Sequence, residues 1–386
     1  MRILVASDKF KGALNAREVT QNIAKGLLDV LPDAEIELMP MADGGEGTAK
    51  AICDARGCSW LECKAHDPLG REIDARYGWI EQEKLAVMEM SEAAGMRQLS
   101  ESERDPIRAT TFGVGEMILD ASKRGAKEII IGLGGSATND GGFGMARALG
   151  YRFFSDAKEL TGAVTDLQNL TEIEPPVAVG VAPANSKMQP ARLPLQLDII
   201  AAVDVKNPLL GENGATRVFG PQKGASKGDL DNLERALTRL GGIVATEFGF
   251  DYRDQAGAGA AGGLGFGLLS FCGATIRPGF EVVAEAVGLE RKMKDADLVI
   301  TGEGSLDRQT LEGKTPAGVA RLARELHKPV FAIVGRATED RELSELFDGI
   351  YENARPGMSQ QENIKRAAEL LRENARELAD TFGVGL

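Results

Sequence analysis

Three short apolar runs in this chain end directly in polar loops that are rich in glycine. The runs cover residues 128–132, 198–203 and 298–301, and each has the length and apolar character of a buried parallel strand. Glycines after such strands let backbone N–H groups approach an anion, and the following helix adds its positive end. The pattern predicts an open α/β sheet with a ligand site beyond the carboxyl ends of its strands.

Glycine-rich polar loops recur through the whole chain. Glycine accounts for 47 of the 386 residues, where a usual content of about 7% would give roughly 27. The five loops cover residues 41–48, 132–142, 204–224, 257–263 and 301–307. On its own, each loop serves a turn as readily as a ligand. Four of them contain Asp or Glu, however, and carboxylates beside a bound phosphate need Mg²⁺ between them. The combination indicates a phosphoryl-transfer site.

Charge and cysteine content exclude several other classes. Lys and Arg number 45 against 58 Asp and Glu, a net charge of −13, which disfavours nucleic acid and anionic membranes as partners. No apolar stretch approaches the ~18 residues of a membrane span. The four cysteines form no C-x-x-C pair, and there are only two histidines, so zinc and a disulfide framework are not expected. We expect a cytoplasmic protein.

The order of predicted elements indicates one domain inserted into another. The first ~60 residues read as β-α-β-α, whereas residues 60–90 read as three strands without a helix, as in an antiparallel sheet. Alternating strands and helices return near the C-terminus. Residues 171–196 read mostly as loop. Residues 257–267 read either as a flexible linker or as a tightly packed helix start, which the large apolar residues that follow favour. We therefore expect a discontinuous parallel-sheet domain with a second domain inserted into it.

An alternative function comes from the segment 132–137, which matches the dinucleotide pattern G-x-G-x-x-A after a strand. It suggests an NAD-dependent hydroxy-acid dehydrogenase. Against it, Asp140 and the two following glycines fall where the helix should already be running, and histidine is scarce. Residues 313–315 resemble the end of a Walker motif, but Arg308 stands where that motif requires glycine. The G-x-S-x-G match at residues 224–228 follows no apolar strand.

Taken together, six segments resemble the bacterial glycerate kinase type 1 family, in order and over nearly the whole chain. They are residues 7–12, 42–48, 67–70, 134–142, 220–225 and 301–304. The resemblance implies ATP-dependent phosphorylation of D-glycerate, at the 2-hydroxyl, with Mg²⁺. It also implies a two-domain α/β architecture: a flavodoxin-like or Rossmann-like domain made from both chain ends, an inserted α/β domain, and a site in the cleft. We place the domains at residues 1–64 plus 290–386 and at residues 65–289.

Four residues are our candidates for the chemistry itself. Lys11 and Arg217 would hold the glycerate carboxylate or the transferred phosphoryl group. Asp43 and Asp204 follow strand ends and would bind Mg²⁺ or accept the proton of the substrate hydroxyl. Lys9, by contrast, reads as a surface charge.

A larger set would bind substrate or phosphate. It comprises Gly44, Gly45, Gly134, Gly135, Ser136, Thr138, Asn139, Asp140, Lys223, Gly302 and Gly304. Glu303 and Asp307 are further candidates for Mg²⁺. For each carboxylate, and for Asp140 above all, the alternative is a loop cap bonded to backbone N–H groups. The sequence does not decide between a monomer and a homodimer.

Overall fold

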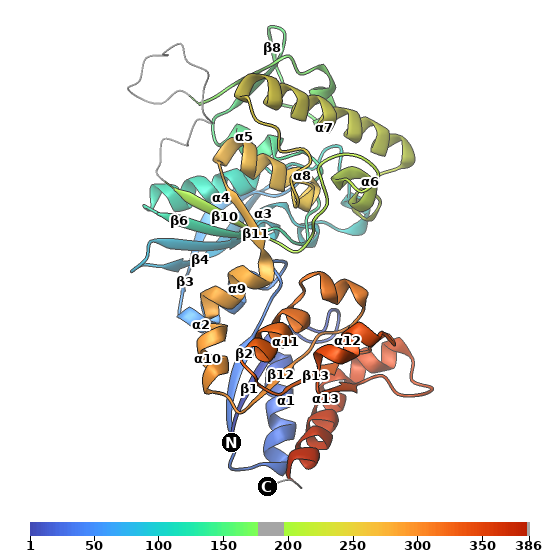
Figure 1. Ribbon diagram of the computed structural model, residues 1–386. Helices are drawn as coiled ribbons and strands as arrows, with labels where there is room; N and C mark the ends of the chain where they lie inside the picture. Colours follow the sequence, from blue (N-terminus) through green and yellow to red (C-terminus); the bar gives the residue numbers. More distant parts are fainter. Residues whose placement is uncertain (177–196, 384–386) are drawn as a thin grey trace. The chain divides into compact units, whose positions relative to one another are not determined.

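Both ends of the chain contribute strands to one parallel sheet (Figure 1). The computed structural model describes residues 1–176 and 197–383. In the sheet, the strand order is β14-β13-β12-β1-β2, and every neighbouring pair is parallel. The strands are β1 (Arg2–Ser7), β2 (Glu35–Pro40), β12 (Leu298–Thr301), β13 (Val330–Val334) and β14 (Gly349–Glu352). The predicted parallel sheet from both chain ends is confirmed.

The strand order reverses between β1 and β12. From β1 the chain continues to β2 on one side, whereas β12 leads through β13 to β14 on the other. The two strands pair directly, with Val5 opposite Ile300. Ligands of open α/β sheets bind beyond the carboxyl ends of the strands at such a reversal. The residues that follow Ser7 and Thr301 therefore occupy the favoured position.

Seven helices of the described chain accompany this sheet. They are α1 (Ala16–Val30), α2 (Thr48–Arg56), α9 (Gly279–Val287), α10 (Leu289–Asp295), α11 (Thr315–Glu325), α12 (Arg341–Leu346) and α13 (Gln360–Gly383). Asn15 caps α1: its side chain accepts the Glu18 N–H at 3.0 Å, and the Glu18 carboxylate accepts the Asn15 N–H at 2.9 Å. Helix α1 packs on α13 (Figure 1), and their apolar faces share a core with Ile3, Val5 and Ile300.

A second sheet of six strands lies in the middle of the chain, with order β11-β10-β6-β5-β4-β3. Its strands are β3 (Ser59–His66), β4 (Glu72–Ile80), β5 (Leu85–Glu89), β6 (Glu128–Gly132), β10 (Asp198–Val203) and β11 (Thr275–Pro278). The pairs β3/β4 and β4/β5 are antiparallel, as predicted for residues 60–90. Strands β5, β6 and β10 are parallel, so their carboxyl ends lie along one edge.

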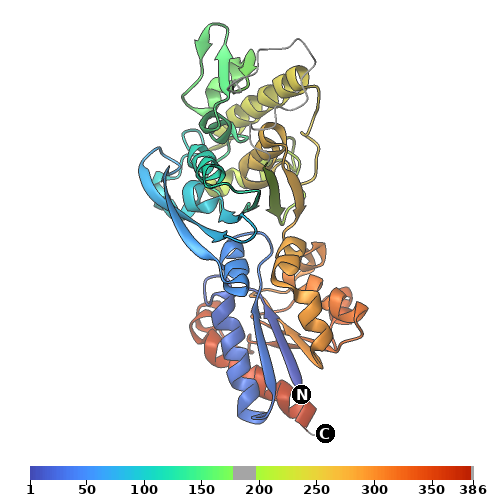
Figure 2. The ribbon, with the colours of Figure 1, turned by 90° about the vertical axis from the view of Figure 1, so that its left-hand side faces the viewer.

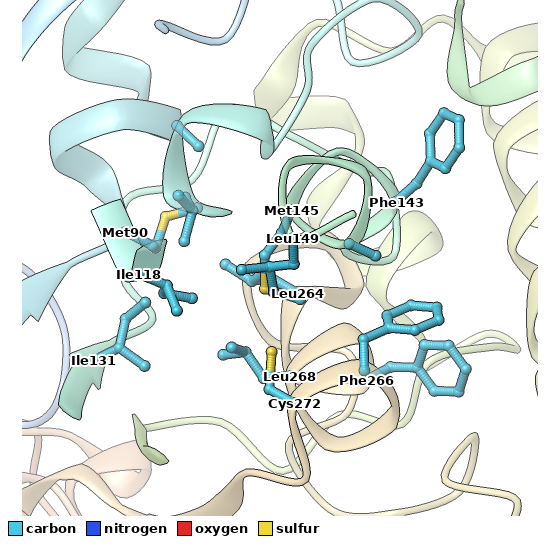
Figure 3. Packing of buried hydrophobic residues seen from close by; sticks show 14 of the residues in the cluster. Met90, Ile118, Ile131, Phe143, Met145, Leu149, Leu264, Phe266, Leu268 and Cys272 are labelled. Carbon is cyan, nitrogen blue, oxygen red and sulfur yellow. The ribbon is translucent and has the colours of Figure 1, made fainter. Parts of the chain in front are cut away.

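Helices bury one side of this sheet. The larger ones are α4 (Phe112–Lys123), α5 (Phe143–Ala148), α7 (Lys227–Phe248) and α8 (Ala260–Gly267), with the short α3 (Ser91–Ala94) and α6 (Ala215–Phe219). Figure 3 shows side chains of α4, α5 and α8 gathered with Met90 and Ile131 in one apolar core. A small antiparallel sheet, β8-β7-β9, completes this part, from β7 (Arg152–Ser155), β8 (Lys158–Glu159) and β9 (Glu172–Glu174).

The glycine stretch at residues 257–267 does not begin as a regular helix. Ala261, Gly262 and Gly263 have positive φ, and a π-helix at Leu268–Cys272 follows α8. A Cβ atom on Gly262 would lie 2.0 Å from the Thr138 carbonyl oxygen. These glycines therefore allow close backbone contact with residues 138–142, which is a packing role.

Contacts divide the chain into two units. Unit 1 comprises Met1–Arg56 and Pro278–Leu386, and unit 2 comprises Gly57–Arg277. Our expectation set the boundaries after residues 64 and 289. Strand β3, however, pairs along its whole length with β4, so residues 59–64 belong with unit 2. Figure 2 shows both chain ends within unit 1.

One sequence prediction is only partly covered by the structure. Of residues 171–196, predicted as loop, residues 172–174 form β9, and residues 177–196 lie outside the described residues. None of the helices within residues 1–176 and 197–383 is both long and apolar enough to cross a bilayer.

Candidate active site

In unit 1, the segments after β1 and β12 are joined at the strand-order reversal. The Ser7 hydroxyl and the Asp8 N–H both donate to the Gly302 carbonyl, at 2.9 and 3.0 Å. A Cβ atom on Gly302 would lie 2.1 Å from the Ile333 carbonyl oxygen, so only glycine fits there. On Gly304 a Cβ atom would approach the Lys11 nitrogen to 3.3 Å. Ser7 and Gly302 are 295 residues apart in the chain, and their contact brings the two segments together at the carboxyl ends of β1 and β12.

Asp8 is a buried carboxyl at this edge, with 6% of its surface exposed. Its Oδ1 accepts the Lys9 N–H at 2.6 Å, and its Oδ2 accepts the Thr315 hydroxyl at 3.3 Å. The Lys9 Nζ lies 3.7 Å from the same carboxylate and donates to the Glu46 carbonyl at 2.8 Å. Burial raises the pKa of Asp8 to about 6, with the Asp43 charge acting in the same direction and Lys9 opposing it.

Glu303 is a second buried carboxyl of the same edge. Its Oε1 accepts a hydrogen bond from the Thr310 hydroxyl. Burial raises the pKa of Glu303 to about 7, assisted by the charges of Asp8 and Asp307, while the Thr310 hydrogen bond and Lys314 oppose the rise. Clustered carboxyl groups that titrate near neutral pH are typical of sites for proton transfer or cations.

The other predicted residues of unit 1 lie around these carboxyls or follow neighbouring strands. Asp43 is half-buried after β2, and its Oδ1 accepts the Gly45 N–H at 3.4 Å. Gly44 packs against the start of α9, where a Cβ atom on Gly279 would lie 2.4 Å from its Cα. Lys11 is exposed. Asp307 is half-buried, and its N–H donates to the Thr310 hydroxyl at 3.2 Å.

In unit 2, the polar loop after β6 is mostly buried. Ser136, Thr138, Asn139 and Asp140 are all buried, whereas Gly134 is half-buried and Gly135 is exposed. The Asp140 carboxylate accepts four donors: the Thr111 N–H at 2.8 Å, the Thr111 hydroxyl at 2.9 Å, and the N–H groups of Gly142 and Gly144 at 3.0 Å. Asp140 thus organises the turn into α5, and Gly134 and Gly135 are the accessible part of the loop.

Lys223 reaches into this loop from the 3₁₀ turn Pro221–Lys223. Only 2% of it is exposed, and its Nζ donates to the Ser136 hydroxyl and the Thr138 carbonyl, both at 2.7 Å. Burial lowers the pKa of Lys223 to about 7, although the charge of Asp140 favours the protonated amine. The Asn139 amide donates to the Thr216 hydroxyl at 2.9 Å. The loop is therefore fixed from two directions.

Asp204 and Arg217 lie elsewhere in unit 2. Asp204 is exposed directly after β10, at the carboxyl edge of the parallel strands. Arg217 forms an ion pair with Asp231 at 2.8 Å, and both line a surface pocket with residues of α7. The hydrogen bond to Asp231 raises the pKa of Arg217. A role for Arg217 in binding an anion requires that it exchange this partner.

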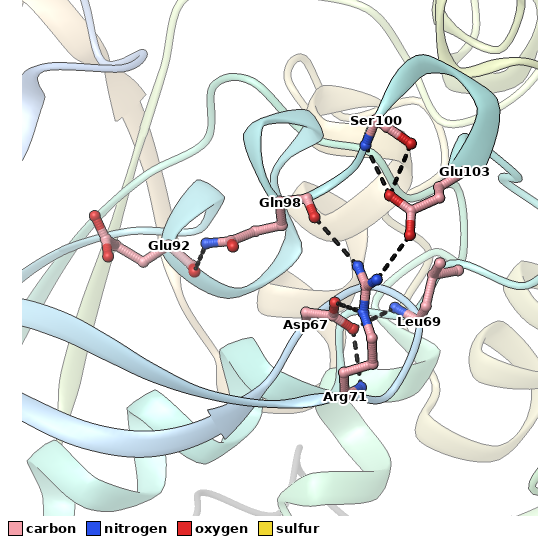
Figure 4. Close-up of polar contacts among 7 residues, drawn as sticks. All are labelled: Asp67, Leu69, Arg71, Glu92, Gln98, Ser100 and Glu103. Carbon is pink, nitrogen blue, oxygen red and sulfur yellow. Dashed lines mark hydrogen bonds and ion pairs between the residues drawn. The ribbon is translucent and has the colours of Figure 1, made fainter.

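The segment 67–70 forms a closed turn between β3 and β4 (Figure 4). The buried Asp67 carboxylate accepts the N–H groups of Leu69 and Arg71 at 2.8 and 2.9 Å. Arg71 in turn bonds the Asp67 and Glu103 carboxylates and the Gln98 carbonyl. This motif therefore shapes the turn.

Sequence reasoning missed several residues of the two edges. Asp8 directly follows the end of β1, as Asp204 follows the end of β10, so the rule that selected Asp204 would have found it. Glu89 ends β5 opposite Gly132, and it is buried. Thr310 and Thr315 gave no such signal because they reach the edge only through the folding of a 3₁₀ turn and the start of α11.

Comparisons with known proteins point to glycerate kinases, and each covers most or all of the chain. The model of the glycerate kinase family matches residues 3–383. The glycerate kinase of Halalkalibacterium halodurans is 40% identical over 98% of this chain and 97% of its own length. The glycerate 2-kinase of Escherichia coli K12 is 40% identical over 88% of this chain and 86% of its own. A crystal structure assigned as glycerate kinase 2 from Salmonella typhimurium LT2 has a TM-score of 0.83 and 38% identity, covering 100% of this chain and 99% of that one.

Proposed function

Because the chain belongs to the glycerate kinase family, we propose that it transfers the γ-phosphoryl group of ATP to the 2-hydroxyl of D-glycerate, giving 2-phosphoglycerate and ADP. The family assignment supports a kinase with ATP as co-substrate, and nothing in it supports the dehydrogenase alternative. The choice of the 2-hydroxyl rests on the likeness to the Escherichia coli glycerate 2-kinase.

The main structural support for the proposed reaction is the pair of buried carboxyl groups, Asp8 and Glu303, at the strand-order reversal of unit 1. A general base works best when its pKa lies near the working pH. Glu303, with a pKa of about 7, and Asp8, with a pKa of about 6, meet that condition. We therefore add them to Asp43 and Asp204 as candidates for accepting the proton of the substrate hydroxyl.

The carboxyl groups after β1 and β12 would suit an Mg²⁺ ion that binds together with the nucleotide. Within the described parts of the chain, no three His, Cys, Asp or Glu side chains form a ready-made metal site. Mg²⁺ in kinases usually keeps several waters and takes one or two protein carboxylates plus substrate phosphates. Asp8 and Glu303 would supply those carboxylates, with Asp43 and Asp307 beside them. When bound, the ion neutralises charge on the phosphates.

Two groups of donors would hold the substrates. In unit 2, Gly134 and Gly135 would offer backbone N–H groups to phosphate, because they are the accessible part of their loop. Lys223 acts as a positioning residue there, since its Nζ donates to the Ser136 hydroxyl and the Thr138 carbonyl. In unit 1, the exposed Lys11 would hold the glycerate carboxylate more readily than Arg217, which is already paired.

Two further features stay predictions. All four cysteines are free thiols, which fits a reducing compartment and a cytoplasmic location. The assembly, monomer or homodimer, needs a direct measurement of mass in solution.

The experiment that tests the function compares two assays on the same enzyme. One measures ADP formation from ATP, Mg²⁺ and D-glycerate, with the product identified by ³¹P NMR; the other measures NAD⁺ reduction with the same acid. We expect ADP and 2-phosphoglycerate in equal amounts and no reduction of NAD⁺. Formation of 3-phosphoglycerate would contradict the 2-hydroxyl assignment, and ADP formation that ignores glycerate would contradict the substrate.

A further inference from the structure

Unit 2 contains a cationic pocket that the phosphoryl-transfer proposal does not use. It lies among the end of β3, the start of α4, α5 and the turn at residues 161–163, is open to solvent, and has a volume of about 480 Å³. Its lining includes His66, Arg108, Thr110, Phe112 and Arg147, and none of the described residues that line it is Asp or Glu. In a chain with a net charge of −13, such a concentration of cationic side chains is a local exception.

Arg147 is the strongest feature of this pocket. Its guanidinium lies over the rings of Phe112 and Phe143, 5.7 and 5.3 Å from their centroids. Within residues 1–176 and 197–383, no carboxylate forms an ion pair with it. Burial lowers its pKa, against the charges of Glu159 and Asp140, but a guanidinium stays charged in proteins. A half-buried, unpaired cation that faces a pocket would gain from an anionic ligand.

Two further polar side chains, those of His66 and Arg108, line the same pocket. The His66 Nδ1 is bound to the Glu116 carboxylate at 2.9 Å, and its ring contacts Phe112 edge-on at 5.9 Å. Because Nδ1 is engaged by the Glu116 carboxylate, Nε2 is the ring nitrogen available to a ligand. Arg108 is exposed at the pocket. The turn held by Asp67 and Arg71 forms another wall, so part of the pocket is rigid (Figure 4).

We propose that this pocket binds a small organic phosphate, with Arg147 and Arg108 on its phosphate group and His66 beside them. Guanidinium groups match phosphate oxygens with two parallel hydrogen bonds, and they are weakly hydrated, so they suit a half-buried anion site. The volume falls within the roughly 300–1,000 Å³ of small-molecule pockets. The face of Phe112 offers an apolar surface for the organic part. The pocket shares no lining residue with the set proposed for phosphoryl transfer, so the two proposals can be tested independently.

Isothermal titration of the full-length protein with phosphoglycolate tests this site. Saturating D-glycerate, Mg²⁺ and a non-hydrolysable ATP analogue fill the catalytic site beforehand. We expect saturable binding to wild type, and we expect Arg147→Met and Arg108→Gln each to weaken it by at least about tenfold, the scale of a lost charged hydrogen bond. Arg147→Met keeps an unbranched side chain on the two rings. Arg341→Gln, at a side chain 92% exposed on α12, is the control and should bind as wild type does.

Steady-state kinetics without phosphoglycolate complete the test. We expect both pocket variants to keep the wild-type kcat and the wild-type KM for glycerate and ATP. The proposal is overturned if wild type shows no saturable binding, if both pocket variants bind as tightly as wild type, or if they raise the KM for glycerate, since the pocket would then be the substrate site. Should Arg147→Met fail to fold, the exposed Arg108 decides the outcome alone.

Discussion

Asp8 and Glu303 are carboxyl groups whose surroundings favour the protonated form up to near-neutral pH. Burial is the largest cause in both, and neighbouring carboxylates add to it. Each also accepts one hydroxyl, from Thr315 and Thr310 respectively, which favours the ionised form. The balance between burial, the neighbouring charges and these hydrogen bonds sets the pH at which either carboxylate can accept a proton or bind a cation.

Removing the Thr310 hydroxyl should shift the pH dependence of the reaction. The hydrogen bond lowers the pKa of Glu303, so Thr310→Val should raise it further above its present value of about 7. If Glu303 must be ionised for activity, the acidic limb of the kcat/KM profile moves to higher pH, by about half a unit to one unit for a hydrogen bond of about 1 kcal/mol. Thr246→Val, at an exposed position on α7, is the matched control. An acidic limb that stays in place would remove Glu303 from the titrating step.

Lys223 gives a prediction about stability. Its pKa is about 7 in the folded chain, against an ordinary value of about 10.4 in the unfolded chain. Between these values the unfolded state binds more protons, so the free energy of unfolding rises with pH because of this residue. Relative to Lys223→Met, wild type should gain up to about 1 kcal/mol per pH unit above pH 7.

Urea unfolding of both proteins at pH 7, 8 and 9 measures this difference. A difference that does not change with pH would mean that Lys223 stays protonated in the fold, bonded as an ammonium to Ser136 and Thr138.

For single residues, the sequence predicted which positions lie near the candidate site better than it predicted how deeply each side chain is buried. Glu303 and Asp204 were both selected as acidic residues after strands, yet one is buried with a raised pKa and the other is exposed. Lys9 read as a surface charge, but its ammonium bonds the Glu46 carbonyl and lies beside Asp8. Burial depends on segments distant in the chain, and no local pattern encodes it.

Among the contacts between elements, the one between the loop at residues 138–142 and the glycine stretch at residues 257–263 leaves the least room for a side chain. Gly262 has a φ of +69°, and its absent Cβ would lie 2.0 Å from the Thr138 carbonyl oxygen. Gly262→Ala should therefore lower the free energy of unfolding by more than about 2 kcal/mol, through both backbone strain and the clash.

A second glycine provides the control for this variant. Gly242 lies inside α7, and a Cβ atom there would have no neighbour within 4 Å. Gly242→Ala should raise stability by up to about 1 kcal/mol, because alanine favours the helix. Guanidinium unfolding of both variants measures the two effects. Equal stabilities would show that the contact at Gly262 is not tight.

Strands were easier to predict than this contact. Apolar runs and alternation gave the three strands of residues 60–90 and the parallel strands of both chain ends, because those patterns are local. For residues 257–267 the sequence left a linker and a helix start open. The left-handed turn observed there is selected by the backbone it packs against, which lies more than 100 residues earlier.

Over the whole molecule, the change from alternating elements to consecutive strands predicted that one domain interrupts another. The structure has the corresponding two units, with boundaries after Arg56 and Arg277. The glycine loops with carboxylates indicated phosphoryl transfer, but only the set of six segments indicated glycerate. Substrate identity is a property of the complete site, and no single loop specifies it.

Whether phosphoryl transfer takes place at the carboxyl edge of β1 and β12 is tested most directly by the single-turnover rate of the full-length Glu303→Gln variant. ATP, Mg²⁺ and D-glycerate are all saturating in this measurement. Loss of an ionisable carboxyl that accepts the proton or binds Mg²⁺ should lower the rate by about 100-fold or more while the fold is kept. Glu290→Gln, on the exposed face of α10, should leave the rate unchanged. A wild-type rate in Glu303→Gln would contradict the assignment of phosphoryl transfer to the carboxyl edge of β1 and β12.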